Sequence, residues 1–63
     1  MSQNEVILNH MKTIGSITPM EALLDYGCFR LGARIYDLKR SGYNIVAKAV
    51  EANGKRFAEY RLI

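Results

Sequence analysis

Residues 17–40 read ITPMEALLDYGCFRLGARIYDLKR, and this stretch decides the fold. Its opening has the spacing of a capping box, because Thr18 and Glu21 stand three residues apart. In a capping box each of the two side chains accepts a hydrogen bond from the other residue's backbone amide, which satisfies two amides that the helix leaves unpaired. Pro19 has the fixed φ that suits the first position of a helix. These residues predict a short helix over residues 19–26.

Apolar residues repeat at helical spacing on both sides of Gly27. Gly27 can adopt the left-handed backbone conformation that commonly ends a helix, and a second helix is predicted over residues 29–40. The expected buried faces are Met20, Leu23 and Leu24 in the first helix, and Leu31, Ile35 and Leu38 in the second. Two amphipathic helices joined by a short turn that contains glycine form a helix-turn-helix. Cys28, in that turn, is expected to be a small buried residue.

The segment before this stretch predicts another helix, over residues 4–14. Ser2 and Glu5 again have capping-box spacing, and Gly15 provides a stop. The apolar stripe of this helix consists of Ile7, Met11 and Ile14, with Leu8 beside them. His10, on the same helix, is expected at the surface.

The segment after it predicts a β-hairpin with strands at about residues 43–50 and 55–62. Asn53-Gly54 is the preferred pair for a two-residue type I′ turn. Folding there pairs residues whose numbers sum to 107, so that an opposite-charge pair, Lys48 and Glu59, meets across the strands. The same register gathers Ile45, Ala47, Tyr60 and Leu62 on one face for the core, and Val46, Lys48, Glu59 and Arg61 on the other for solvent.

Together these elements predict one α+β domain over residues 1–63, with three helices followed by a two-stranded hairpin. A hairpin alone is marginally stable, and so are three short helices alone, so each is expected to pack against the other. Ile17 can add a short strand to the hairpin, but a single residue does not establish one.

The chain has 63 residues and a net charge of +3, and this charge is unevenly distributed. Residues 1–27 carry one basic and three acidic side chains, a net charge of −2. Residues 28–63 carry eight basic and three acidic side chains, a net charge of +5. A positive surface on one half of so small a domain predicts a polyanion or an acidic partner.

The composition argues against several other classes of protein. A single cysteine, Cys28, allows no internal disulfide, which favours a reducing, cytoplasmic location. No apolar run has membrane-spanning length and the first residues lack the basic segment of a signal peptide, so we expect no membrane partner. One Cys and one His do not make a usual zinc site, and the six carboxylates are scattered. We therefore expect neither enzyme activity nor a metal or other cofactor.

Five segments of the chain resemble a known family: ITPMEAL (17–23), YG (26–27), RLGARIYDLKR (30–40), GYNI (42–45) and YRL (60–62). In their order and spacing they are similar to the small winged helix-turn-helix DNA-binding domains of bacteriophages, prophages and mobile elements. The resemblance implies that the helix at 29–40 is the recognition helix and that the hairpin is a wing. The chain departs from the pattern at Phe29, which stands where a Thr or Ser N-cap is expected.

A recognition helix lies in the major groove with its N-terminal half toward the base edges. There Arg30 can bind guanine O6 and N7, and Ala33 can contact a thymine methyl group. Residues farther along the helix, at its edges and at the hairpin tip then meet the phosphate backbone. Eight residues are expected to contact double-stranded DNA: Arg30, Ala33, Arg34, Tyr36, Lys39, Arg40, Lys55 and Arg56.

On this reading the protein is a sequence-specific regulator of transcription or an excisionase-like accessory protein. A domain this small contacts few base pairs, so tight binding calls for a homodimer or several copies on adjacent sites.

Other interpretations of the same residues remain open at this point. Arg34 and Asp37 are i, i+3 neighbours and can simply pair with each other on the helix surface. The exposed aromatic residues Phe29 and Tyr36 suit contact with a protein as well as with a nucleic acid. The alternative hypothesis is therefore a protein-binding module, such as a small inhibitor that holds a host protein on its aromatic and basic face.

Overall fold

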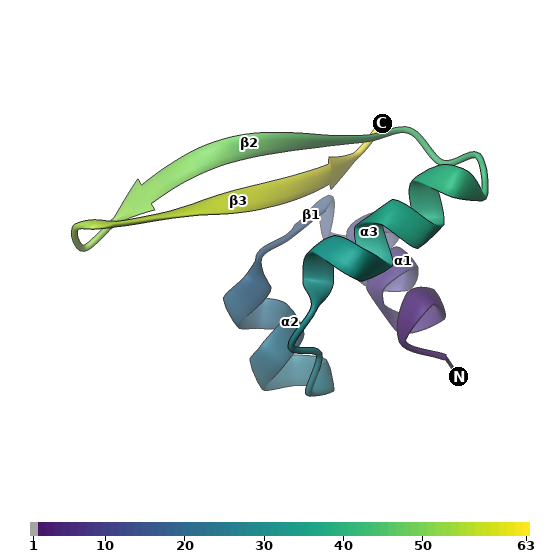
Figure 1. Cartoon of the computed structure of the whole chain (residues 1–63), viewed down its shortest axis with the longest axis horizontal. Helices are drawn as coiled ribbons and strands as arrows, with labels where there is room; N and C mark the ends of the chain where they lie inside the picture. The colour runs from purple at the N-terminus through teal and green to yellow at the C-terminus, as the bar shows by residue number, and fades with distance from the viewer. Residues whose placement is uncertain (1) are drawn as a thin grey trace.

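The computed structural model describes residues 2–63 (Figure 1). Its elements are α1 (Gln3–Ile14), β1 (Ser16–Ile17), α2 (Pro19–Tyr26), α3 (Leu31–Arg40), β2 (Ile45–Ala52) and β3 (Lys55–Leu62). The helices gather at one end of the hairpin, while the tip of the hairpin projects away from α1 and α3 (Figure 1). The predicted order of three helices followed by a hairpin is confirmed.

The sheet has three strands, rather than the two that the sequence predicts. Its order is β1-β3-β2, and β1 pairs with β3 in antiparallel fashion through Ser16↔Arg61 and Ile17↔Tyr60. Gly15 makes this pairing possible, because its left-handed backbone (φ 105°) ends α1 and turns the chain directly into β1. Ile17 is fully buried, so this two-residue strand fastens the base of the hairpin to the core.

The hairpin pairs in the register that the sequence predicts, starting from Ile45 opposite Leu62 at its base. Asn53 and Gly54 both have positive φ (52° and 74°), as a type I′ turn requires. Because this turn matches the right-handed twist of the strands, the two turn residues and the alternating pattern together set the register.

Two elements start later than the sequence predicts. The strand β2 begins two residues late, because the Tyr43 amide donates to the Leu38 carbonyl oxygen (3.2 Å) and so belongs to the end of α3. The helix predicted over 29–40 begins at Leu31. Arg30 takes the N-cap position (φ −120°, ψ 63°) without a side-chain cap bond, as expected where no Ser, Thr, Asp or Asn is available.

Local capping sets the starts of the first two helices. At α2 both bonds of the capping box are present: the Thr18 amide donates to Glu21 Oε1 (2.9 Å), and the Glu21 amide donates to Thr18 Oγ1 (3.3 Å). At α1 the Glu5 amide donates to Ser2 Oγ (3.2 Å), while the Ser2 hydroxyl donates to Glu5 Oε1 (3.3 Å). Such an N-cap typically stabilises a helix by about 1 kcal/mol.

A buried polar contact joins α1 to α2. His10 is only 5% exposed, so the expectation that it lies at the surface is wrong. Its Nδ1 lies 2.8 Å from the Tyr26 hydroxyl oxygen, and its Nε2 lies 3.8 Å from Glu21 Oε2. Nδ1 and the Tyr26 hydroxyl share one hydrogen bond, whose direction depends on which ring nitrogen carries the proton. The two rings also meet edge to face, with centroids 5.6 Å apart.

This contact fixes the rotation of α2 about its own axis. Glu21 and Tyr26 face His10, so the residue between them on that side, Ala22, turns inward and is fully buried. The stripe that the sequence predicts to be buried turns outward instead: Met20, Leu23 and Leu24 are 61%, 36% and 74% exposed.

The hydrophobic core lies where the helices meet the base of the sheet. Its buried members are Ile7, Met11, Ile17, Ala22, Cys28, Leu31, Ile35, Leu38 and Ile45. The buried face predicted for α3 and the burial of Cys28 are therefore confirmed. Ile14 and Ala47, however, are exposed rather than buried, because the last turn of α1 and the part of β2 beyond its first residue extend past the core.

We expect Tyr26→Phe to lower the free energy of unfolding by about 1–2 kcal/mol, because it leaves Nδ1 of the buried His10 without its hydrogen-bond partner. Urea denaturation should show a lower midpoint with an unchanged slope. Tyr43→Phe is the matched control, since it removes a hydroxyl that makes no hydrogen bond within residues 2–63. Equal stability of the Tyr26→Phe variant and the parent would contradict a structural role for the contact.

Two glycines offer a second test of stability. Gly32→Ala should raise the free energy of unfolding by about 0.5–1 kcal/mol, because Gly32 is helical and an added Cβ would meet only the Tyr60 hydroxyl oxygen, at 3.9 Å. Gly27→Ala should lower it by about 1–2 kcal/mol, because Gly27 has a left-handed backbone (φ +64°). Open space surrounds the added Cβ at Gly27, so the comparison isolates backbone conformation. Thermal denaturation should show a higher melting temperature for Gly32→Ala and a lower one for Gly27→Ala than for the parent protein.

Candidate nucleic-acid interface

The outward face of α3 is the first part of the candidate interface. Leu31, Ile35 and Leu38 anchor the helix in the core, so residues on the opposite side face solvent. Tyr36, Lys39 and Arg40 are exposed on this helix, and Arg30 is exposed just before it, whereas Ala33 and Arg34 are half-buried. Six of the eight expected contact residues therefore lie on α3 or at its N-cap.

One edge of α3 lies beside the hairpin. A Cβ added to Gly32 would lie 3.9 Å from the Tyr60 hydroxyl oxygen of β3, which is an ordinary van der Waals distance. Lys39 lies two turns along the same edge. The Tyr60 side chain of the sheet therefore reaches the first turn of α3.

Arg34 lies on the other edge of α3 and is already paired. Its Nη2 lies 3.1 Å from Asp37 Oδ2, one helical turn away. The alternative that these two residues simply pair on the helix surface therefore describes the geometry of the structure. The pair also neutralises Asp37, the one acidic side chain on α3, whose charge would otherwise oppose an anionic ligand.

An aromatic residue positions Arg40 near the end of α3. The Arg40 guanidinium carbon lies 5.8 Å from the centroid of the Tyr36 ring, which is within the range of a cation–π contact. Both side chains are exposed, so this contact restrains the guanidinium group without burying it. The outward face of α3 therefore presents an arginine whose freedom is already reduced.

The hairpin, which we call the wing (residues 45–62), is the second part of the candidate interface. Lys55 and Arg56 are exposed at the start of β3, next to the turn, and Figure 1 shows this tip as the farthest point of the hairpin from its base. Two further basic side chains, Lys48 and Arg61, share the face of the wing that the sequence assigns to solvent, and both are exposed. They were not among the expected contacts, although the alternation of the strands identifies that face.

Most of the expected basic contacts are free of acidic partners. Within residues 2–63, five of them make no ion pair: Arg30, Lys39, Arg40, Lys55 and Arg56. Their charges are consequently available to an anionic ligand, which distinguishes them from Arg34.

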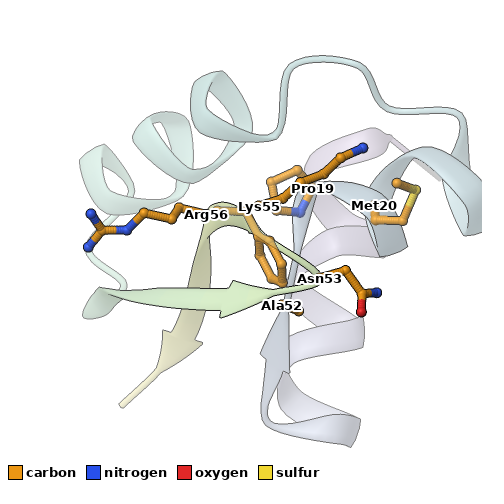
Figure 2. Close-up of a pocket in the computed structure, with 7 residues that line it drawn as sticks. Pro19, Met20, Ala52, Asn53, Lys55 and Arg56 are labelled. Carbon is orange, nitrogen blue, oxygen red and sulfur yellow. The ribbon is translucent and has the colours of Figure 1, made fainter.

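A hollow of about 480 Å³ separates the tip of the wing from the start of α2 (Figure 2). Pro19 and Met20 line it from α2, and Lys55 and Phe57 line it from β3. Figure 2 shows Arg56 extending away from Pro19 and Met20, so it is Lys55 that lies beside the apolar residues. The hollow continues the exposed apolar surface that the rotation of α2 produces.

Phe29 is the most exposed large apolar residue of the described chain, at 86%. It lies in the turn between α2 and α3, between the buried Cys28 and the N-cap Arg30. It was not among the expected DNA contacts. The signal in the sequence was its departure from the family pattern, because a phenylalanine stands where a Ser or Thr N-cap was expected.

No helix within residues 2–63 has both the length and the apolar character needed to span a bilayer. The same residues contain no cluster of three or more His, Cys, Asp or Glu side chains that could hold a metal ion.

The arrangement of elements, α1-β1-α2-α3-β2-β3 with a basic recognition face, agrees with a comparison against protein families. The family model described as a winged helix-turn-helix domain matches residues 2–63. The chain belongs to the winged helix-turn-helix family. No curated protein and no solved structure gives a significant match to it.

Membership of the winged helix-turn-helix family indicates a function in binding double-stranded DNA. By its position in the fold, α3 corresponds to the recognition helix of such a domain, and the hairpin corresponds to its wing. The family match covers both elements, together with β1, which the sequence alone did not establish.

Proposed function

We propose that this winged helix-turn-helix domain binds double-stranded DNA with sequence specificity, with α3 in the major groove and the wing on the flanking backbone. The observation that carries the proposal is the set of basic side chains without acidic partners on the outward face of α3 and at the tip of the wing. Phosphates supply an anionic partner for such side chains on both sides of a groove.

The expected contacts divide into two roles. Arg30 precedes the first turn of α3 and is expected to bind guanine O6 and N7, and Ala33 is expected to contact a thymine methyl group. The remaining residues are expected to bind the backbone and set the orientation of the domain on the duplex. These backbone contacts are Arg34, Tyr36, Lys39, Arg40, Lys55 and Arg56.

We further propose that the protein acts as a transcriptional regulator or an excisionase-like accessory protein of a phage or mobile element. The similarity of its segments to domains of that origin supports this assignment. A single recognition helix reads few base pairs, so tight binding requires a homodimer or several copies on adjacent sites.

The proposal predicts that Arg30→Ala and Arg40→Ala weaken binding to DNA in different ways. For a pool of random duplexes, loss of a phosphate contact by Arg40→Ala should reduce the salt dependence of log Kd by about one unit of slope. Arg30→Ala should cost about 1–3 kcal/mol on a selected high-affinity duplex and relax the base preference at one position. Fluorescence anisotropy at several salt concentrations measures both effects.

Lys12→Ala is the matched control, because it removes a basic charge from α1, outside the proposed interface. It should leave the base preference unchanged. Absence of binding at low salt, or binding that is indifferent to both arginines, would refute the proposed interface.

Asp37→Asn should strengthen DNA binding by about two- to fivefold at low salt, since it removes a negative charge from the recognition face and releases Arg34 to bind phosphate. Glu5→Gln changes the net charge of the protein equally but lies on α1, so it corrects for the overall charge. If the two variants bind DNA equally well, Asp37 has no local role at the interface.

A second candidate function is the binding of a host protein on the aromatic and basic face of α3. The exposure of Phe29 (86%) and Tyr36 (60%) favours it, because large exposed aromatic residues commonly anchor protein interfaces. Affinity capture from a nuclease-treated host lysate distinguishes the two functions. Capture that survives nuclease and depends on Phe29 would support the protein partner.

A further inference from the structure

The turn between α2 and α3 divides its residues between the core and the solvent. The Gly27 amide donates to the Leu23 carbonyl oxygen (2.9 Å) and the Cys28 amide donates to the Ala22 carbonyl oxygen (3.0 Å), which holds the turn against the end of α2. Cys28 is 2% exposed and fills the inward position of the turn. The next residue, Phe29, is 86% exposed, so its side chain lies in solvent.

Phe29 is neither part of the hydrophobic core nor among the residues packed against it. A phenylalanine just before an N-cap often packs onto the first turn of the helix, where it meets an apolar residue at the fourth helical position. In α3 that position is Arg34, whose charged group is turned to Asp37 instead. A large apolar side chain left in solvent next to Arg30 gains free energy only when a ligand covers it.

We infer that Phe29 reads the 5-methyl group of thymine in the major groove. This inference rests on the proposed binding of DNA through α3. The residues that begin a recognition helix are those closest to the base edges, and the thymine methyl is the apolar group that the major groove displays. Phe29 is far more exposed than Ala33, the other apolar residue expected to contact this methyl group, which is half-buried. Phe29 is therefore the stronger candidate for this contact.

The experiment compares thymine with deoxyuridine, which differs only by the absence of that methyl group. The parent protein first selects its best duplex from a random pool, and each thymine of that duplex is then replaced singly by deoxyuridine. Loss of one buried methyl contact should weaken binding of the parent protein by about fourfold at one position. Fluorescence anisotropy at constant salt gives the Kd of each duplex.

The same duplexes are then measured with Phe29→Ala, Phe29→Leu and Leu24→Ala. Phe29→Ala should bind the thymine and deoxyuridine duplexes equally at that position, and Phe29→Leu should retain part of the discrimination. Leu24→Ala is the matched control, because it also truncates a highly exposed apolar side chain, on α2, and should keep the full discrimination. Thermal denaturation verifies that the variants are folded.

The outcomes separate this inference from the proposed function. If the parent binds DNA with a steep salt dependence but Phe29→Ala leaves every thymine preference unchanged, the methyl contact is refuted while DNA binding stands. If Phe29→Ala weakens all duplexes alike, the side chain wedges or stacks without reading the methyl group, and the inference fails. Absence of salt-dependent binding by the parent refutes both.

Discussion

The hydrogen bond between His10 and Tyr26 is the constraint on which the arrangement of the helices depends. His10 is buried, so losing the Tyr26 hydroxyl leaves its Nδ1 without a partner in the interior. Glu21, in the first turn of α2, lies near the same imidazole ring, with its Oε2 3.8 Å from His10 Nε2. With α2 held in this rotation, the turn at its end and the start of α3 follow. A polar contact between α1 and α2 thus helps to orient the basic face of α3.

The wing depends on a different constraint, the two-residue strand β1. Its pairing with β3 stops at Ile17, so the base of the wing is part of the core while the tip is free of it. Cross-strand pairs and the type I′ turn order the tip, which faces the start of α2 across the hollow. This separation allows the tip to carry Lys55 and Arg56 without placing their charges near apolar side chains of the core.

The sequence predicts best those features that short segments determine. The capping box at Thr18, the register from Asn53-Gly54 and the buried face of α3 each follow from a few neighbouring residues, and all appear in the structure. The buried face predicted for α2 was wrong, because an eight-residue helix with apolar residues on most sides has no single preferred face. The burial of His10 and the pairing of β1 depend on partners far along the chain, which local patterns do not reveal. The expected site residues stay predictions, although the paired state of Arg34 distinguishes it from the others.

The turn between the helices links the stability of the domain to what it presents to a ligand. Cys28 and Phe29 are consecutive, so the hydrogen bonds that hold Cys28 in the core also anchor the backbone next to Phe29. A backbone anchored before binding loses less conformational freedom on binding, which matters in a domain that offers few contacts. The same reasoning applies to Arg40, which Tyr36 restrains. The charge of the chain is unevenly distributed, with +5 on residues 28–63 and −2 on residues 1–27. The positive part would attract an anion. Charge alone does not distinguish one DNA sequence from another. That discrimination requires side chains that contact the base edges from a restrained position.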